Sequence, residues 1–268
     1  MITAQDSTAE EPALGRLSLR RVPLILMYHS VAAVPEDPNH VCVTPARFAE
    51  QMAWLASRGL RGVSIGTLVA ALRDGRARGL VGITFDDGYD NILGNAVPEL
   101  LRHHFTATMF IVSSRIGGTN EWDGEPVWPL MTAGQVAEVA AAGMEIGSHS
   151  ATHAKLPGLS EERLRAEVHD SRARLGELLG QPVRGFAYPY GKMDAAVRQA
   201  VRDAGYQYAC SVETRPADMG DMALPRMTIG ERDTAARLAA KKRFYRGYTA
   251  VVGSRAGQQL IRRLAAIA

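Results

Sequence analysis

The sequence predicts an α/β fold in a single domain, built on a parallel sheet that is either a closed barrel or doubly wound. Three observations predict this class. Short apolar, β-rich runs alternate with helical patterns along the 268-residue chain, no domain-sized linker separates them, and 46% of the residues are hydrophobic. In both architectures the functional residues gather at the C-terminal ends of the strands, where the βα loops meet.

The strands are expected at the apolar, β-rich runs, residues 22–28, 61–65, 80–85, 107–112, 144–148, 183–188 and 207–212. Helices are expected between them, at residues 45–58, 90–104, 132–142, 160–179 and 193–204. Pro45 suits a first helical turn, Thr132 and Ser160 are typical N-caps, and Gly205 is a typical C-terminal cap.

Composition narrows the class of protein further. Two cysteines indicate no disulfide framework. The first 21 residues lack the apolar segment of a secretory signal, and no run approaches the 18 apolar residues of a membrane span. We therefore expect a soluble, cytoplasmic protein with a disordered or extended segment 1–21, a main α/β domain 22–234 and a basic helical tail 235–268.

The tail, residues 235–268, carries eight Lys and Arg residues and no acid, although the net charge of the whole chain is +3. Either this is a solvated helix, or it approaches an anionic membrane or an anionic substrate. It carries no motif of a nucleic-acid-binding protein, so no nucleic-acid partner is expected. The sequence does not indicate an oligomeric state.

The strongest local pattern is ITFDDGYDN, residues 83–91, in which a buried-type strand ends in Asp86 and Asp87. Two adjacent carboxylates are costly to bury unless a cation compensates them or one takes a proton. Gly88 can start a turn that directs both toward one site. The alternative is an ordinary loop whose aspartates cap a helix.

A second pattern, GSHSATH at residues 147–153, places His149 and His153 four residues apart. On a helical turn this spacing puts both imidazoles on one face. Two imidazoles and one carboxylate form a plausible catalytic metal site. His-x-x-x-His alone is weak, but it gains weight beside an Asp-Asp-Gly strand end.

Two further strand ends complete the set of candidates. In FAYPYG, residues 186–191, Pro189 and Gly191 impose a tight turn that could direct a backbone N–H into a pocket. In LILMYHSV, residues 24–31, the first strand ends at His29. Taken alone, His29 is most simply a hydrogen-bonded residue at the edge of the core.

Together these segments resemble the polysaccharide deacetylase family, whose domain is also known as the NodB homology domain or carbohydrate esterase family 4. TFDDG resembles its first motif, HSATH its second, and PYG the end of its third. The resemblance spans about residues 22 to 230. It implies a distorted (β/α)7 barrel and metal-dependent hydrolysis of N-acetyl groups on amino sugars, or of O-acetyl esters.

The resemblance also implies roles for individual residues. Asp87, His149 and His153 match the metal ligands, for which zinc is the first expectation and cobalt, nickel or manganese are possible. Asp86 matches the general base that deprotonates a water molecule. The backbone N–H of Tyr190 matches the donor that stabilises the oxyanion.

This chain departs from the family pattern at two points. Many members carry an Arg that orients the base at the position of Ala187, so another cation must replace it; Arg226 is the first candidate and Arg184 the second, unless both are structural. The late motif that supplies a general acid is not recognisable. A branch that acts on poly-N-acetylglucosamine instead begins with an LMYHS strand, and this similarity implies that His29 is the acid.

Aromatic residues are weaker candidates for contact with the substrate. Trp122 and Trp128 lie in the loop 120–130 and Tyr188 precedes the third motif; each either lines the sugar site or packs the loop. The expected substrate is an N-acetylated amino sugar, as an intracellular glycoside, an antibiotic intermediate, a lipid-linked sugar or an oligosaccharide. The alternatives are a deformylase or other small-amide hydrolase, and an inactive sugar-binding module.

Overall fold

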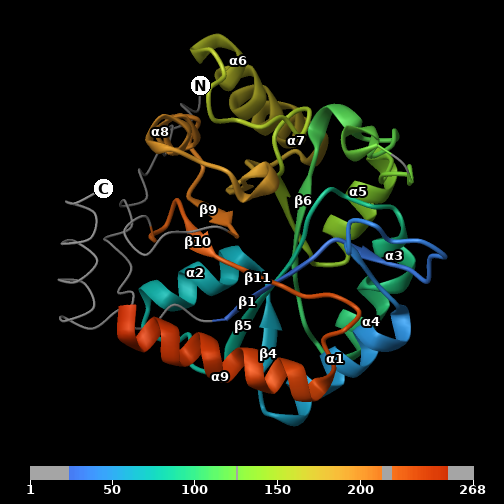
Figure 1. Ribbon diagram of the computed structural model, residues 1–268. Coiled ribbons are helices and arrows are strands. Elements are labelled where there is room, and N and C mark those ends of the chain that lie inside the picture. Colours follow the sequence, from blue (N-terminus) through green and yellow to red (C-terminus); the bar gives the residue numbers. More distant parts are fainter. Residues whose placement is uncertain (1–23, 125, 213–218, 253–268) are drawn as a thin grey trace, which may run out of the picture.

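The computed structural model describes residues 24–124, 126–212 and 219–252, and it shows a ring of strands surrounded by helices (Figure 1). The expected segment 1–21 and the tail beyond residue 252 lie outside the described residues. No helix in these ranges is long and apolar enough to cross a membrane.

The main sheet is parallel throughout and runs in the order β10-β9-β8-β7-β6-β5-β1-β11, with β4 beside the start of β5. Its strands are β1 (Ile25–Tyr28), β4 (Arg61–Val63), β5 (Leu80–Phe85), β6 (Thr108–Ile111), β7 (Glu145–Ser148), β8 (Gly185–Ala187), β9 (Tyr208–Ser211), β10 (Leu224–Pro225) and β11 (Met227–Thr228). A separate pair joins β2 (Ser30–Val31) to β3 (Cys42–Val43). Each predicted strand is therefore present: β5 has the predicted bounds, and the other six are shorter by one to three residues.

The barrel is closed by the last strand segment. β10 pairs with β9 and β11 pairs with β1, and Arg226 is the single residue between β10 and β11. Residues 224–228 thus form one interrupted strand that spans from β9 to β1. This strand is the seventh of the ring, together with β1, β5, β6, β7, β8 and β9.

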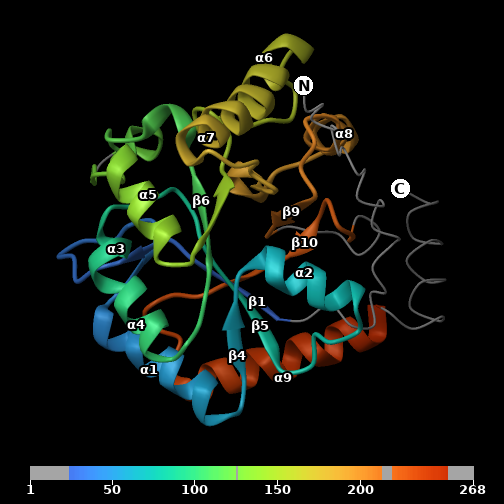
Figure 2. The same ribbon diagram turned by 180° about the vertical axis from the view of Figure 1, so that it is seen from behind.

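Helices cover the outside of the ring, as both views show (Figures 1 and 2). They are α1 (Pro45–Ser57), α2 (Ile65–Arg73), α3 (Asn91–Asn95), α4 (Val97–Arg102), α5 (Ala133–Ala141), α6 (Glu161–Arg165), α7 (Ser171–Leu179), α8 (Ala195–Asp203) and α9 (Ala235–Val252). The predicted N-caps are confirmed: the side chains of Thr132 and Ser160 accept hydrogen bonds from Gln135 N and Arg163 N.

Three elements differ from the sequence prediction. The expected helix 90–104 is two helices, because Pro98 lacks the N–H that would continue α3. The segment 160–179 is interrupted between α6 and α7 by one wide π-helical turn, Ala166–Asp170. The expected strand 61–65 stops at Val63, and α2, which the sequence analysis did not predict, begins at Ile65.

Helix α2 packs on the start of β5. Ile65 and Leu68 lie so close to Gly82 that a Cβ there would overlap them. At the N-terminus of α2, the Glu145 carboxylate accepts hydrogen bonds from Gly66 N and Thr108 Oγ1, both at 2.8 Å. These contacts involve the first residue of β7, so the opposite ends of the strands stay available for a functional site.

Candidate metal centre and active site

The two aspartates of the first motif follow β5 and turn inward. Asp87 has φ 71° and Gly88 has φ 85°, so the chain reverses in a left-handed turn immediately after the strand. A left-handed conformation is uncommon for an aspartate and is found where the surrounding structure enforces it. Both carboxylates are buried, and the backbone N–H of Asp86 donates to Tyr28 O at 3.0 Å. The turn starts at Asp87, one residue earlier than expected.

The second motif is not helical, which corrects the expectation that a helical turn aligns its histidines. Residues 149–153 form a loop after β7 in which Ser150 (φ 66°) and His153 (φ 63°) are left-handed. The Ser150 hydroxyl accepts from His153 N at 3.0 Å and folds the loop back on itself. His149 and His153 therefore converge through a loop conformation that residue spacing does not predict.

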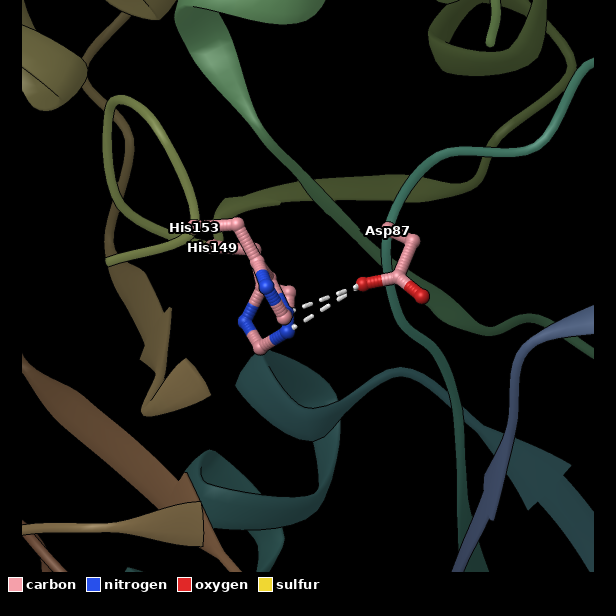
Figure 3. A group of neighbouring side chains, drawn as sticks. All are labelled: Asp87, His149 and His153. Carbon is pink, nitrogen blue, oxygen red and sulfur yellow. Dashed lines mark ion pairs between the residues drawn. The ribbon is translucent and has the colours of Figure 1, made fainter. Parts of the chain in front are cut away.

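Asp87, His149 and His153 converge on one point, as Figure 3 shows. Asp87 Oδ1 lies 3.5 Å from His149 Nε2 and 3.4 Å from His153 Nε2. All three side chains are buried. They are the one group of three potential metal ligands within 4.8 Å of one another among the residues that the structure describes.

This donor set fits a divalent cation. Ligands placed tetrahedrally at about 2.0–2.1 Å from an ion are about 3.3–3.4 Å apart, close to both measured separations. The His149 Nδ1–H donates to Ala187 O at 2.8 Å, which leaves the Nε2 lone pair facing the triad. Burial lowers the pKa of His149 to about 4 and that of His153 to about 2, so both imidazoles are neutral, as ligands must be.

Arg226 holds the second carboxylate, Asp86, from the closing strand. Its guanidinium donates to Asp86 Oδ1 and Oδ2 at 2.5 and 2.7 Å, and to Thr84 Oγ1 at 3.2 Å. Burial raises the pKa of Asp86, but the Arg226 charge and hydrogen bonds, helped by His149, outweigh burial and hold it at about 2. Arg184, the second candidate, is exposed at the opposite end of β8.

The third motif forms the tight turn that the sequence predicts. Pro189–Gly191 is a single 3-10 turn in which Tyr190 is left-handed, with φ 57°. The Ser211 hydroxyl donates to Gly191 O at 2.7 Å and fixes this turn to β9. The Tyr190 ring packs edge-on against His153, 4.6 Å between centroids, so this turn borders the metal triad. Ala187, which departs from the family pattern, also contributes to the site, because its carbonyl oxygen orients the His149 ring.

His29 lies at the same end of the barrel. It follows Tyr28, which pairs with Phe85, the residue before Asp86. The His29 charge contributes to the pKa of Asp86, His149 and His153, which places its imidazole within electrostatic reach of the site. The side chain is half-buried and therefore retains access to solvent.

The three aromatic candidates have different environments. The Trp122 ring stacks on His153 at 4.5 Å between centroids, and the ring of Trp128 packs against Tyr89 at 5.8 Å. Both tryptophans are partly exposed. Tyr188 is fully buried and its hydroxyl donates to Met222 O at 2.9 Å. The expectation of substrate contact at Tyr188 is therefore corrected, because a core residue offers a sugar no surface.

A closed parallel barrel carries a carboxylate and two imidazoles at the C-terminal ends of its strands, beside a second carboxylate held by Arg226, an arrangement typical of a hydrolase with a metal centre. The polysaccharide deacetylase family model matches residues 74–209, half of the chain. The chain belongs to the polysaccharide deacetylase family.

Individual relatives agree with this assignment. YxkH of Bacillus subtilis strain 168, a polysaccharide deacetylase by name, is 29% identical over 76% of this chain and 70% of its own length. The poly-β-1,6-N-acetyl-D-glucosamine N-deacetylase of Staphylococcus epidermidis is 24% identical over 81% and 78%. The solved structure of the Streptococcus pyogenes deacetylase PplD has the same fold, with a TM-score of 0.71, 24% identity, and coverage of 81% of this chain and 96% of that one. The predicted family, barrel fold and enzyme class, an N-deacetylase, are confirmed.

The residues that support the site were not predicted from the sequence. Glu167 accepts hydrogen bonds from the histidine loop, and Thr84 accepts one from Arg226. Thr84 carried a weak signal, since it lies two residues before Asp86 and therefore faces the same side of β5. Glu167 carried none, because it lies inside a predicted amphipathic helix among other acids.

Proposed function

We propose that this chain is a divalent-metal-dependent hydrolase that removes the N-acetyl group from an N-acetylated amino sugar. The observation that carries the proposal is the buried triad Asp87–His149–His153 beside a separate carboxylate, Asp86, that a guanidinium holds in its ionised form. Neutral imidazoles with one carboxylate form a ligand set that suits zinc, and also accommodate cobalt, nickel or manganese.

Different residues of the chain carry out different steps of the proposed reaction. Asp87, His149 and His153 would hold a divalent cation, and its Lewis acidity would polarise the acyl carbonyl and lower the pKa of a water molecule. Asp86 accepts the proton of the attacking water, because it is ionised and its position is fixed by Arg226. The Tyr190 N–H donates to the oxygen that gains negative charge. His29 protonates the leaving nitrogen. An amine leaving group needs this proton more than an alcohol leaving group does.

An amino sugar is supported as the substrate by relatives and by the aromatic rim. The Staphylococcus epidermidis relative acts, by its name, on an N-acetylglucosamine polymer. Trp122 stacks on His153 of the triad, and Trp128 lies in the same loop against Tyr89; both are partly exposed, and aromatic rings of this kind pack against sugars. Contact of the basic tail with an anionic partner is a further part of the proposal; Arg243 is exposed on α9, whereas Arg237 and Lys241 pair with Asp233.

The direct test is acetate and formate release from a panel of N-acyl amino sugars and their oligosaccharide, lipid and nucleotide conjugates. The assay is run with chelator and then with Zn²⁺, Co²⁺, Ni²⁺ or Mn²⁺ added back. We expect acetate release that chelator abolishes and metal restores. Formate release without acetate release would instead identify a deformylase.

Asp86→Asn separates catalysis from binding within the same assay. Because the amide cannot accept the proton, we expect acetate release to fall by at least about 100-fold while metal binding is retained. Asp74→Asn, which removes a surface carboxylate paired with Arg76, is the control and should leave the rate unchanged. Undiminished acetate release by Asp86→Asn would contradict the proposal. Glycan binding without release by the unmodified chain would indicate a sugar-binding module.

A further inference from the structure

The loop that carries both histidine ligands, residues 149–153, has few contacts that fix its shape. It starts with His149 N donating to Ile111 O, and the carbonyls of Ser150 and Ala151 accept from Ser113 N and Ser114 N. Two left-handed residues interrupt regular structure within five positions. Such a conformation persists where its surroundings enforce it, so the remaining donors of the loop decide whether the two imidazoles stay together.

His153 N donates to the Ser150 hydroxyl within the loop, and three other donors converge on one side chain, Glu167. Its Oε2 accepts from Ala151 N at 3.0 Å and from Thr152 N at 2.9 Å, and its Oε1 accepts from the Thr152 hydroxyl. The carboxylate is buried, and all three groups, from two residues, donate to its oxygens, so both oxygens act as acceptors. Ala151 and Thr152 are two of the three residues between the histidines.

The helix that carries Glu167 is locally shaped for this contact. Glu167 lies in the π-helical turn between α6 and α7, where regular i to i−4 hydrogen bonding is interrupted. Its own carbonyl also accepts from Ala151 N at 3.0 Å, and the next carbonyl, that of Val168, accepts from the Tyr206 hydroxyl at 3.1 Å. Main chain and side chain of Glu167 therefore bind the same residue of the loop.

From this geometry we propose that Glu167 is a positioning residue for the metal centre: it holds loop 149–153 in the conformation that brings His149 and His153 onto one ion. The inference rests on the proposed metal site. Without the carboxylate, the N–H and the hydroxyl of Thr152 lose their acceptor and Ala151 N keeps only the Glu167 carbonyl, so the loop relaxes toward conformations that separate the imidazoles. Glu167 acts through the ligands and touches neither metal nor substrate.

The test measures metal affinity of the full chain rather than turnover. Zn²⁺ affinity is determined by competition with a chromophoric chelator, and Co²⁺ binding by its visible absorption spectrum, which reports the ligand geometry. For Glu167→Gln, which keeps the shape but replaces an acceptor oxygen by a donor, we expect Zn²⁺ affinity to fall about 10–100-fold, with a changed Co²⁺ spectrum. Thr152→Val, which removes one of the three hydrogen bonds, should give a smaller loss of several-fold.

Glu145→Gln is the matched control. Glu145 also accepts from one backbone N–H and one threonine hydroxyl, but at the opposite end of β7, beside α2. Its variant should lose comparable thermal stability and keep the Zn²⁺ affinity and Co²⁺ spectrum of the unmodified chain. An equal loss of affinity in Glu145→Gln would overturn the inference, because the effect would then reflect general destabilisation.

The outcomes also separate the inference from the function on which it rests. An unmodified chain that binds no Zn²⁺ overturns the proposed function, and the role of Glu167 with it. An unmodified chain that binds Zn²⁺ while Glu167→Gln binds it equally tightly overturns the inference alone. If Glu167→Gln does not fold, Thr152→Val decides, since an unchanged affinity and spectrum in that variant would contradict a positioning role.

Discussion

At the scale of single residues, Asp86 and Asp87 are neighbours in sequence with opposite surroundings. Asp87 faces two neutral imidazoles, whereas Asp86 faces the guanidinium of Arg226. The left-handed φ of Asp87 brings both carboxylates to the same site. In an extended strand, consecutive side chains would point to opposite faces. Asp87 is thereby available to bind a metal, and Asp86 stays ionised in the absence of a metal.

Arg226 should set the acid limb of the pH–rate profile. Without the guanidinium, burial raises the pKa of Asp86, so the base becomes protonated at a higher pH. We expect Arg226→Met to reduce acetate release and to shift the acid limb of kcat/KM upward by at least one pH unit, with Arg226→Lys intermediate. The comparison is a pH–rate profile for each variant and for Arg102→Met, a surface control paired with Glu99. An unmoved acid limb would exclude this role for Arg226.

His29 should matter for turnover and not for metal binding. As the general acid, it is needed when the nitrogen leaves, so His29→Ala should lower kcat by about 100-fold or more with Zn²⁺ affinity retained. His104→Asn is the control, because His104 is exposed and left-handed (φ 55°) and Asn tolerates that conformation. If His29→Ala instead loses metal and keeps the kcat of its loaded fraction, His29 belongs to the structure of the site.

Strand-end patterns and the family resemblance together allowed much of the candidate site to be predicted, and the limits are physical. Asp86, Asp87, His149 and His153 were found because catalytic groups gather at strand ends. Arg226 was found as one of two candidates, and the sequence did not separate it from Arg184 because their distance from Asp86 depends on barrel closure. A local sequence pattern does not predict such long-range geometry.

At the scale of elements, apolar runs predicted strands well and failed where a run changes structure within itself. In RGVSIGTLVAAL, residues 61–72, the strand and α2 are separated by Ser64 alone, which caps the helix by accepting from Thr67 N. The histidine loop failed for a different reason. Its shape depends on Glu167, which is 14 residues beyond His153, and the i, i+4 spacing of its histidines equally suits a helix.

A contrast between two glycines tests how tightly the strands pack. In Gly185→Ala on β8, the new methyl group would overlap the Tyr208 ring, so we expect a loss of about 1–3 kcal/mol in the free energy of unfolding. Gly94→Ala in α3 meets no atom within 4 Å and should be neutral or stabilise by up to about 1 kcal/mol. Urea denaturation at pH 7 measures both, and equal stabilities of the two variants would show that β8 and β9 separate easily.

At the scale of the whole molecule, stability in the presence of chelator should fall as the solution becomes acidic. Burial lowers the pKa of His149 to about 4 and that of His153 to about 2, below the usual value of about 6.5 in an unfolded chain. As the pH falls below 6.5, the unfolded chain takes up protons that the folded chain cannot, so the free energy of unfolding decreases by up to about 1.4 kcal/mol per pH unit for each histidine.

Urea unfolding at pH 7 and pH 4.5 measures this loss. His149→Gln should show a shallower decrease than the unmodified chain, whereas His104→Gln should not. Zn²⁺ at about 100 times its dissociation constant should raise the free energy of unfolding at pH 7 by about 3 kcal/mol. A free energy of unfolding that is independent of pH between 7 and 4.5 would contradict the burial of neutral imidazoles.

Closure of the barrel by residues 224–228 has a consequence for the order in which the enzyme matures. Asp86 and Arg226 are 140 residues apart, and the strand that carries Arg226 is the last one of the ring to be synthesised. A nascent chain that already contains both motifs of the metal triad therefore still lacks Arg226, whose guanidinium fixes the base Asp86. A chain cut or stalled before Arg226 contains the three ligands but no guanidinium to hold Asp86, so we expect hydrolysis to begin only when the fold is complete.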